Sequence, residues 1–272
     1  MAEIFGFDCY SPKEIAERVE TVGVTKARLP LSSLFILGVL AGGFIGLGAL
    51  YFTLVTSDAE LTFAASQLLG GVAFSLGLVL VVVAGAELFT GNNLLVMAWA
   101  SKRITTAELV KNWSAVYLAN LVGAFGLVIL VYLSHHWQMN GAAVGANAVK
   151  IAIAKATLPF WDAFFKGILC NILVCLAVWL ALAGRGVVDK IFAVTFPISA
   201  FVAAGFEHSI ANMYFIPLGI LVKDQIAVSG SEQLSWTGFF ANLLPVTLGN
   251  MIGGGVMVAL IYYLVYRRRL EN

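Results

Sequence analysis

Long apolar runs alternate with short polar segments along most of this chain. Six of the runs are long enough to cross a bilayer as a helix, which takes about 20 predominantly apolar residues. The second and fifth runs are too long for one straight span, and each contains a polar interruption. The pattern predicts six membrane-spanning helices, at residues 30–55, 62–100, 108–133, 160–184, 189–222 and 236–266.

The two interruptions share one pattern, G-x-E-x4-N. The first begins at Gly85 and the second begins at Gly205, in the other half of the chain. A glutamate and an asparagine at membrane depth need polar partners, so each interruption marks space that is lined by protein. Paired interruptions at corresponding places in two halves are typical of the substrate site of a transporter. We therefore expect broken second and fifth helices in a membrane channel or transporter.

Further matches extend this repeat over both halves of the chain. Each half contains three apolar runs, so the second half enters the membrane with the opposite orientation. The sequence thus predicts an all-α membrane protein built as a 3+3 inverted repeat, with its site near the membrane midplane. The matching elements are N-x7-N-x2-G at Asn112, Asn120 and Gly123 and again at Asn242, Asn250 and Gly253, and a Gly-Val/Ile-Leu triplet at Gly38 and Gly167.

Composition supports a membrane protein and excludes several other classes. Hydrophobic residues make up 60% of the chain, charged residues 11%, and the mean hydropathy is +0.92. Soluble domains are nearer half apolar and a quarter charged. The net charge of +1 provides no basic field for a nucleic acid partner.

The positions of lysine and arginine predict the orientation in the membrane, because these residues concentrate in cytoplasmic loops. Both termini and the loops after the second and fourth runs carry most of them, so we expect both termini in the cytoplasm. The twelve residues on this side are Lys13, Arg18, Lys26, Arg28, Lys102, Arg103, Lys111, Arg185, Lys190, Arg267, Arg268 and Arg269.

A short helix is expected before the first span. Ser11 provides a cap, Pro12 suits the first helical position, and Glu14 completes a capping box. An apolar stripe from Ile15 to Val22 indicates an amphipathic helix on the cytoplasmic surface. The chain then divides into a cytoplasmic N-terminal segment (1–29), a six-span channel domain (30–266) and a cytoplasmic basic tail (267–272).

The interruptions contain the residues that could act on a substrate. His208 either binds an anion and relays a proton, or is satisfied by a backbone carbonyl and holds the broken helix together. Glu87 and Glu207 occupy equivalent places, which favours a structural role in accepting hydrogen bonds from backbone N–H groups freed at each break. Their alternative role is to line a cation pathway. Asn92 and Asn212 are expected to orient the same breaks.

Enzyme chemistry finds no support in the motifs. The sequence contains no G-x-S-x-G elbow, no H-E-x-x-H zinc motif and no phosphate-binding glycine loop. We therefore expect no enzyme activity, no catalytic residue, no metal site and no cofactor.

Three stretches resemble the signatures of the formate/nitrite transporter family, and most of all those of its bacterial formate channels. The resemblance covers essentially the whole chain, in order. The stretches are Ala86-Glu-Leu-Phe-Thr-Gly-Asn-Asn93, Lys166-Gly-Ile-Leu-Cys-Asn171 and Gly205-Phe-Glu-His-Ser-Ile-Ala-Asn-Met213.

This resemblance implies an aquaporin-like fold and a homopentamer in the bacterial inner membrane, with one pore per protomer. By motif, His208 matches the central pore histidine, Thr90 the threonine that faces it, Asn171 an asparagine behind the histidine, and Lys155 a basic residue of the outer vestibule. Leu78 and Phe201 match the cytoplasmic constriction. The full set of constriction residues is Phe74, Leu78, Leu88, Phe89, Val174 and Phe201.

The expected function is passage of small monovalent anions, formate first, coupled to a proton through His208. Two alternatives stay open. One is a nitrite or hydrosulfide channel of the same family. The other is a proton or cation conductor that uses Glu87 and Glu207.

Overall fold

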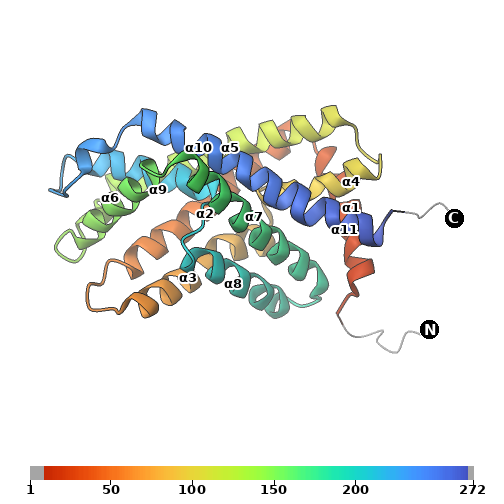
Figure 1. Cartoon of the computed structure of the whole chain (residues 1–272), viewed down its shortest axis with the longest axis horizontal. Helices are drawn as coiled ribbons and strands as arrows, with labels where there is room; N and C mark the ends of the chain where they lie inside the picture. Colours follow the sequence, from red (N-terminus) through yellow and green to blue (C-terminus); the bar gives the residue numbers. More distant parts are fainter. Residues whose placement is uncertain (1–8, 269–272) are drawn as a thin grey trace.

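Helices joined by short loops make up residues 9–268, the part of the chain that this computed structural model describes. Figure 1 shows them in a single bundle, with α1 at one end and α6 at the other. The α-helices are α1 (Pro12–Ala27), α2 (Leu31–Val55), α3 (Phe63–Leu80), α4 (Val96–Ala100), α5 (Thr106–Leu133), α6 (Ala143–Ala156), α7 (Phe160–Ala183), α8 (Val187–Ala203), α9 (Ser209–Val222), α10 (Trp236–Met251) and α11 (Ile261–Tyr266).

Five helical stretches in the described part of the chain are long and apolar enough to cross a membrane by themselves. The fifth predicted run instead forms α8 and α9, of 17 and 14 residues. At 1.5 Å per residue neither reaches the roughly 30 Å of a bilayer core. The five stretches are Leu31–Val55, Phe63–Gly85, Thr106–Leu133, Phe160–Ala183 and Trp236–Tyr266.

Two segments leave the helical path inside the bundle. After α3 a π-helical turn, Val81–Gly85, leads into the non-helical residues 86–88, and a 3₁₀ turn, Gly91–Leu95, leads into α4. Between α8 and α9 the chain is non-helical at residues 206–208. Gly85 and Gly205 begin the two segments with φ of 87° and 68°. Glycine adopts this left-handed region without a steric penalty, which explains its place at both.

Glycines let the long helices cross at very short range. A Cβ atom on Gly42 of α2 would collide with the Asn120 carbonyl of α5, and one on Gly123 would collide with the Val39 carbonyl. In the other half of the chain, a Cβ on Gly253 would collide with the carbonyl of Ile168 in α7. Small residues at such crossings are typical of membrane helices, which associate by close packing.

Helix α1 begins as the sequence predicts and then packs against the bundle. The Ser11 N–H donates to the Glu14 carboxylate at 2.7 Å, and the Ser11 hydroxyl accepts from the Glu14 N–H, which confirms the capping box. The Ser11 hydroxyl also donates to the Glu14 carboxylate at 2.7 Å, and this hydrogen bond together with that from the Ser11 N–H lowers the pKa of Glu14. Ile15 and Val19 are buried within the protein, whereas Val22 is 37% exposed. The apolar stripe therefore faces the rest of the chain more than lipid.

The C-terminal end of the bundle is tied to α1. Arg267 forms ion pairs with Glu17 at 2.8 Å and with Glu20 at 2.6 Å.

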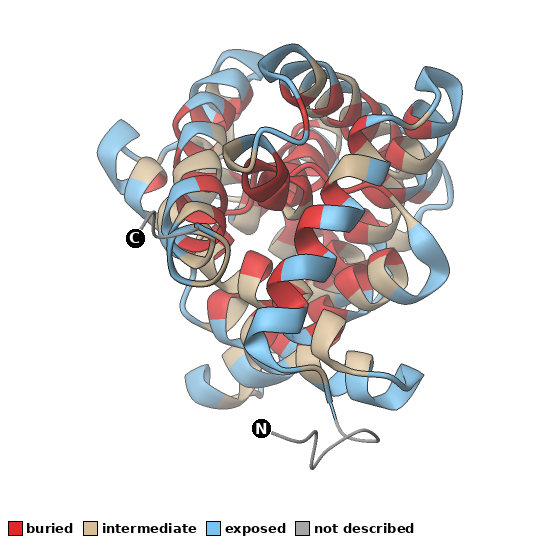
Figure 2. Cartoon of the chain, turned by 90° about the vertical axis from the view of Figure 1, so that its right-hand side faces the viewer, coloured by how far each residue is buried: buried red, intermediate tan, exposed pale blue. Residues whose placement is uncertain are grey.

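Residues 1–8 of the predicted N-terminal segment and 269–272 of the predicted tail lie outside the described residues. Seen from the α1 end in Figure 2, buried residues face the centre of the bundle and exposed ones its rim.

Candidate functional site

The two non-helical segments meet at a hydrogen bond between His208 and Thr90. The His208 Nε2 lies 2.9 Å from the Thr90 Oγ1, and the two residues are 2% and 0% exposed. The other ring nitrogen, Nδ1, accepts from the Ala211 N–H at 3.1 Å, so His208 caps the N-terminus of α9. A ring nitrogen that accepts carries no proton. The contacts therefore assign the proton of the neutral ring to Nε2, from which it is donated to Thr90.

Two side chains of α7 form hydrogen bonds with the backbone carbonyl of Thr90. The Thr90 carbonyl accepts from the Asn171 Nδ2 at 3.2 Å and from the Cys175 Sγ at 3.4 Å. The same Asn171 amide donates to the Asn250 carbonyl at 2.7 Å. Within residues 9–268 no hydrogen bond joins Asn171 to His208, so Asn171 orients the threonine side of the site.

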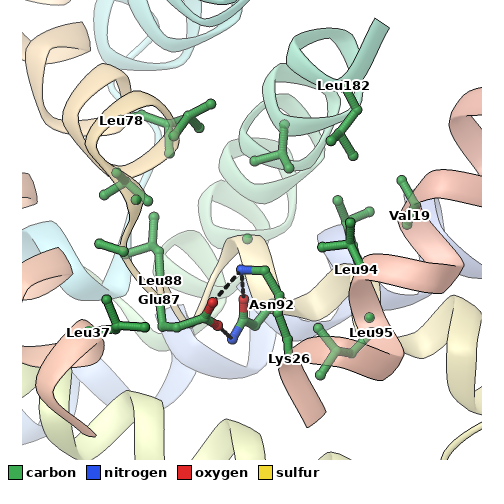
Figure 3. A pocket seen from close by; sticks show the side chains of 18 residues that line it. Val19, Lys26, Leu37, Leu78, Glu87, Leu88, Asn92, Leu94, Leu95 and Leu182 are labelled. Carbon is green, nitrogen blue, oxygen red and sulfur yellow. Dashed lines mark hydrogen bonds and ion pairs between the residues drawn. The ribbon is translucent and has the colours of Figure 1, made fainter. Parts of the chain in front are cut away.

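Glu87 lies in the first break, and its carboxylate contacts two side chains, Asn92 of the break and Lys26 of α1. Its carboxylate accepts from the Asn92 Nδ2 at 2.7 Å and pairs with the Lys26 Nζ at 2.9 Å, as Figure 3 shows. The Asn92 Nδ2 also donates to the Asn112 Oδ1 at 2.9 Å, and the Asn112 Nδ2 donates to the Lys26 carbonyl at 3.1 Å. One polar cluster therefore joins α1 and α5 to the break.

Glu207 has the same set of partners in the second break. Its carboxylate accepts from the Asn212 Nδ2 at 2.6 Å and pairs with the Lys155 Nζ at 2.9 Å. The Asn212 Nδ2 donates to the Asn242 Oδ1 at 2.7 Å, and the Asn242 Nδ2 donates to the Lys155 carbonyl at 2.8 Å. The glutamates thus hold lysine and asparagine side chains, where the sequence led us to expect backbone N–H groups.

The backbone groups freed at the first break are satisfied by Asn120 of α5. Its Oδ1 accepts from the Phe89 N–H at 2.9 Å. Its Nδ2 donates to the Gly38 carbonyl at 2.7 Å and to the Glu87 carbonyl at 2.9 Å. One buried side chain therefore replaces two backbone partners that a continuous helix would supply to the break, and it also ties the break to α2.

Asn250 of α10 makes the equivalent contacts at the second break. Its Oδ1 accepts from the Ser209 N–H at 3.0 Å. Its Nδ2 donates to the Gly167 carbonyl at 2.8 Å and to the Glu207 carbonyl at 3.0 Å. Each break is thus braced by one asparagine and one lysine–glutamate pair.

Part of the polar network around the two breaks was not predicted, although a repeated pentapeptide in the sequence indicates it. The pentapeptide Lys26-Ala-Arg-Leu-Pro30 returns as Lys155-Ala-Thr-Leu-Pro159, and its lysine pairs with the glutamate of one break in each case. In the sequence, the four asparagines of the N-x7-N-x2-G elements indicated the repeat but not their contacts with the breaks. The residues without an assigned role were Lys26, Asn112, Asn120, Asn242 and Asn250.

Two cavities approach the His208–Thr90 contact from opposite ends of the bundle. The α1-side cavity has a volume of about 360 Å³, and Lys26 and Glu87 are its charged lining residues. The α6-side cavity has a volume of about 240 Å³ and is lined by His208 together with Lys155, Lys166 and Glu207.

The structure divides the expected constriction residues between these cavities. Phe74 and Phe201 line the α6-side cavity, with their ring centroids 5.7 Å apart, and the Phe201 ring stacks 6.0 Å from His208. Leu78 and Leu88 line the α1-side cavity. Two residues line neither cavity: Phe89 packs edge-on against Trp113 and Tyr117 of α5, and Val174 is buried.

Charge in the site is largely paired. Lys155 is 16% exposed, pairs with Glu207 and lies 5.3 Å from the centre of the Phe215 ring. It therefore does not offer a free ammonium to the α6-side cavity. No group of three metal-ligating side chains comes together within the described part of the chain.

The sequence and the fold are similar to those of known channels. The family model described as Formate/nitrite transporter matches residues 13–264. The formate channel FocA of Escherichia coli (strain K12) is 43% identical over 278 residues, which cover 98% of each chain. A solved structure described as "Pentameric formate channel with formate bound" has a TM-score of 0.82 at 40% identity and covers 88% of this chain and 98% of that one.

A more distant likeness concerns the fold alone. The aquaglyceroporin from Plasmodium falciparum has a TM-score of 0.53 at 15% identity, covering 86% of this chain and 100% of that one. The all-helical bundle therefore resembles the aquaporin fold, as expected.

The relatives reported above are channels, which agrees with the expectation that this chain is not an enzyme. The family match spans most of the chain, and its apolar helices are those of a multi-pass membrane protein. The chain belongs to the formate/nitrite transporter family.

Proposed function

We propose that this protein is a channel for small monovalent anions, with formate as its main substrate. One observation carries the proposal: the His208–Thr90 hydrogen bond of 2.9 Å lies between two cavities that open at opposite ends of the bundle. A hydroxyl and an imidazole N–H at this point are donors suited to a carboxylate oxygen. The names of the similar proteins above, FocA and the formate-bound pentamer, support formate as the substrate.

Apolar side chains on both sides of this contact select against large or strongly hydrated ions. Phe74 and Phe201 border it on the α6 side, and Leu78 and Leu88 border it on the α1 side. A bare anion loses its hydration at such a constriction, and desolvating an isolated charge costs many kcal/mol. A small anion that is met by donors at the centre recovers part of this cost. The positive end of α9, which starts beside His208, adds to the attraction.

Proton coupling through His208 is the finer part of the proposal, and the hydrogen bonds set a condition on it. An imidazolium carries protons on both ring nitrogens. The Nδ1 currently accepts from the Ala211 N–H, so protonation of the ring displaces that contact. The histidine can therefore donate a proton to an arriving anion only after the first turn of α9 has shifted or the ring has rotated.

We also infer the architecture that the sequence predicts: six spans in a 3+3 inverted repeat, with the second and fifth spans broken. The matched contacts of Glu87 and Glu207, and of Asn120 and Asn250, support this inference. By analogy with its relatives, the protein acts as a homopentamer in the bacterial inner membrane. The distribution of basic residues supports cytoplasmic termini, which places the α1-side cavity toward the cytoplasm.

The alternative of a cation pathway along Glu87 and Glu207 receives less support. Each carboxylate lies 2.9 Å from a lysine ammonium and accepts a further hydrogen bond from an asparagine. A passing cation would have to displace both partners.

The proposal is tested by stopped-flow uptake into proteoliposomes with formate, nitrite, hydrosulfide and chloride at two pH values. We expect fast formate uptake that exceeds uptake of nitrite and of chloride. A preference for nitrite or hydrosulfide would assign the protein to that alternative substrate. Absence of uptake for all four anions would refute the channel proposal.

Substitution of His208 separates its two roles. We expect His208→Asn to retain the cap of α9, because asparagine is a good N-cap residue, and to abolish the pH dependence of formate uptake. We expect His208→Phe to lose the cap as well and to lower thermal stability by about 1 kcal/mol. The measurements are uptake against pH and thermal unfolding in detergent. An unchanged pH dependence in His208→Asn would remove the histidine from the proton pathway.

A further inference from the structure

The two cavities differ in their net charge. Among the described residues, the charged side chains that line the α1-side cavity are Lys26 and Glu87, and these two form an ion pair of 2.9 Å. In the α6-side cavity Lys155 and Glu207 form an equivalent pair, also of 2.9 Å. That cavity is lined in addition by Lys166, which has no equivalent on the other side.

Among the residues that the structure describes, Lys166 is the cation of the α6-side cavity that forms no ion pair. It lies on α7 (Phe160–Ala183), and its residue is half-buried. Its ammonium takes part in no ion pair or side-chain hydrogen bond with any residue from 9 to 268. Asp162, one helical turn earlier, is exposed, does not line the cavity and forms no ion pair with it. The charge of Lys166 is therefore not cancelled locally.

The backbone of Lys166 is fixed close to the second break. Its carbonyl accepts from the Glu207 N–H at 3.3 Å. The Lys166 side chain therefore begins beside Glu207, the residue that precedes His208. Lys155, by comparison, is engaged by Glu207 and by the face of Phe215.

We propose that Lys166 is the residue that gives the α6-side cavity its net positive charge and so sets the capture of anions from that side. This inference rests on the proposed function as an anion channel. It assigns anion capture to Lys166, because the charge of the expected vestibule residue Lys155 is paired with Glu207. It also predicts that formate enters more readily from the α6 side than from the α1 side, where the lining charges cancel.

The size of the effect follows from simple electrostatics. A cavity with low-dielectric walls focuses the field of an uncancelled charge and raises the local concentration of the opposite ion. One unit charge acting over about 10 Å, at a dielectric constant between those of water and the protein surface, changes that concentration roughly three- to tenfold. The Debye length falls from about 30 Å at 0.01 M salt to about 3 Å at 1 M, so the effect should vanish at high ionic strength.

The test replaces the charge and then restores it in the same channel. Lys166→Cys is prepared in a Cys9→Ser background, and its formate current is measured in planar bilayers. Formate is present at low concentration on one side, and gluconate salts set the ionic strength. A positively charged methanethiosulfonate reagent then returns a cation to position 166, and a sulfonate reagent places an anion there. The side from which the reagent acts identifies the orientation of each channel. Cys170 and Cys175 are buried, and the Cys9→Ser protein alone shows whether they react.

We expect the formate current from the α6 side to fall roughly three- to tenfold in Lys166→Cys, to recover with the cationic reagent and to fall further with the anionic one. All three changes should shrink below twofold at about 1 M salt. Lys150→Cys is the matched control. It removes the same charge from the exposed face of α6, outside the cavity, and should change the current less than twofold.

The outcomes separate this assignment from the proposed function. Formate current in the wild type, with less than a twofold response to the charge at position 166, would overturn the assignment alone. An equal response at position 150 would also overturn it, because the effect would then be a general surface potential. Absence of both formate current and stopped-flow formate uptake in the wild type would overturn the proposed function and this assignment together. Uptake without current would indicate electroneutral passage with a proton, and the same variants and reagents would then be compared by initial uptake rate, with the same roughly three- to tenfold changes expected.

Discussion

Replacement of Glu207 by alanine should destabilise the protein by about 3–5 kcal/mol, the usual cost of removing one partner of a buried ion pair. The substitution leaves the Lys155 ammonium, which is 16% exposed, without its carboxylate, and it removes the acceptor of the Asn212 amide. The second break then loses its side-chain contacts to Lys155 and Asn212, whereas the contacts of Asn250 with its backbone remain. Thermal unfolding in detergent should show a large decrease in midpoint, and size-exclusion chromatography should show loss of the assembled form.

A double substitution provides the control for this first prediction. Glu207→Gln combined with Lys155→Met removes both charges and keeps an amide that can accept from Asn212. It should recover most of the lost stability, because no buried charge is left unpaired. The matched variant Glu87→Ala should cost less, since its partner Lys26 is 27% exposed and regains water more easily. A Glu207→Ala protein as stable as the wild type would show that the pair does not brace the break.

Asn250→Ala should be the second highly damaging substitution. The side chain satisfies the Ser209 N–H and the carbonyls of Gly167 and Glu207, and all of these contacts are buried. A buried polar group without a partner costs about 1–3 kcal/mol, so the loss should amount to about 3 kcal/mol or more. We also expect formate flux to fall, because the freed Ser209 N–H lies next to His208.

The equivalent substitution in the first break should give a similar result. Asn120→Ala leaves the Phe89 N–H and the Glu87 carbonyl of the break unpaired, and it removes a second donor from the Gly38 carbonyl. Asn147→Ala is the control: this half-buried asparagine of α6 donates only to Thr53 and Thr56, and its loss should cost about 1 kcal/mol. Equal unfolding midpoints for Asn250→Ala and Asn147→Ala would contradict the bracing role of Asn250.

The elements of this protein could be predicted closely from its sequence, because each apolar run fixes its own length. The first run, predicted at 30–55, is α2 at Leu31–Val55, and the fourth, predicted at 160–184, is α7 at Phe160–Ala183. The capping box at Ser11 was predictable for the same reason, since it depends on neighbours three residues apart. The glycines at 85 and 205 likewise marked where the chain leaves the helical path.

The partners of the site residues could not be predicted in the same way. Lys26 reaches Glu87 only because α1 packs against the break, and Lys155 reaches Glu207 only because α6 does so at the other end. Phe89 belongs to the signature of the first break, yet it packs against aromatic residues of α5. The direction of a side chain in a non-helical segment depends on the packing around it, which no local pattern encodes.

The apolar helices, the positions of the two polar interruptions and the family membership can all be inferred from the amino-acid sequence. These features depend on periodicity, composition and local motifs. Three features of the site appear only once the chain is folded. His208 meets Thr90, Asn120 and Asn250 satisfy the freed backbone, and Lys155 pairs with Glu207 while Lys166 has no ion-pair partner among residues 9–268. These contacts join residues that are far apart in the chain, and they exist only when the close helix crossings have set the register between the helices.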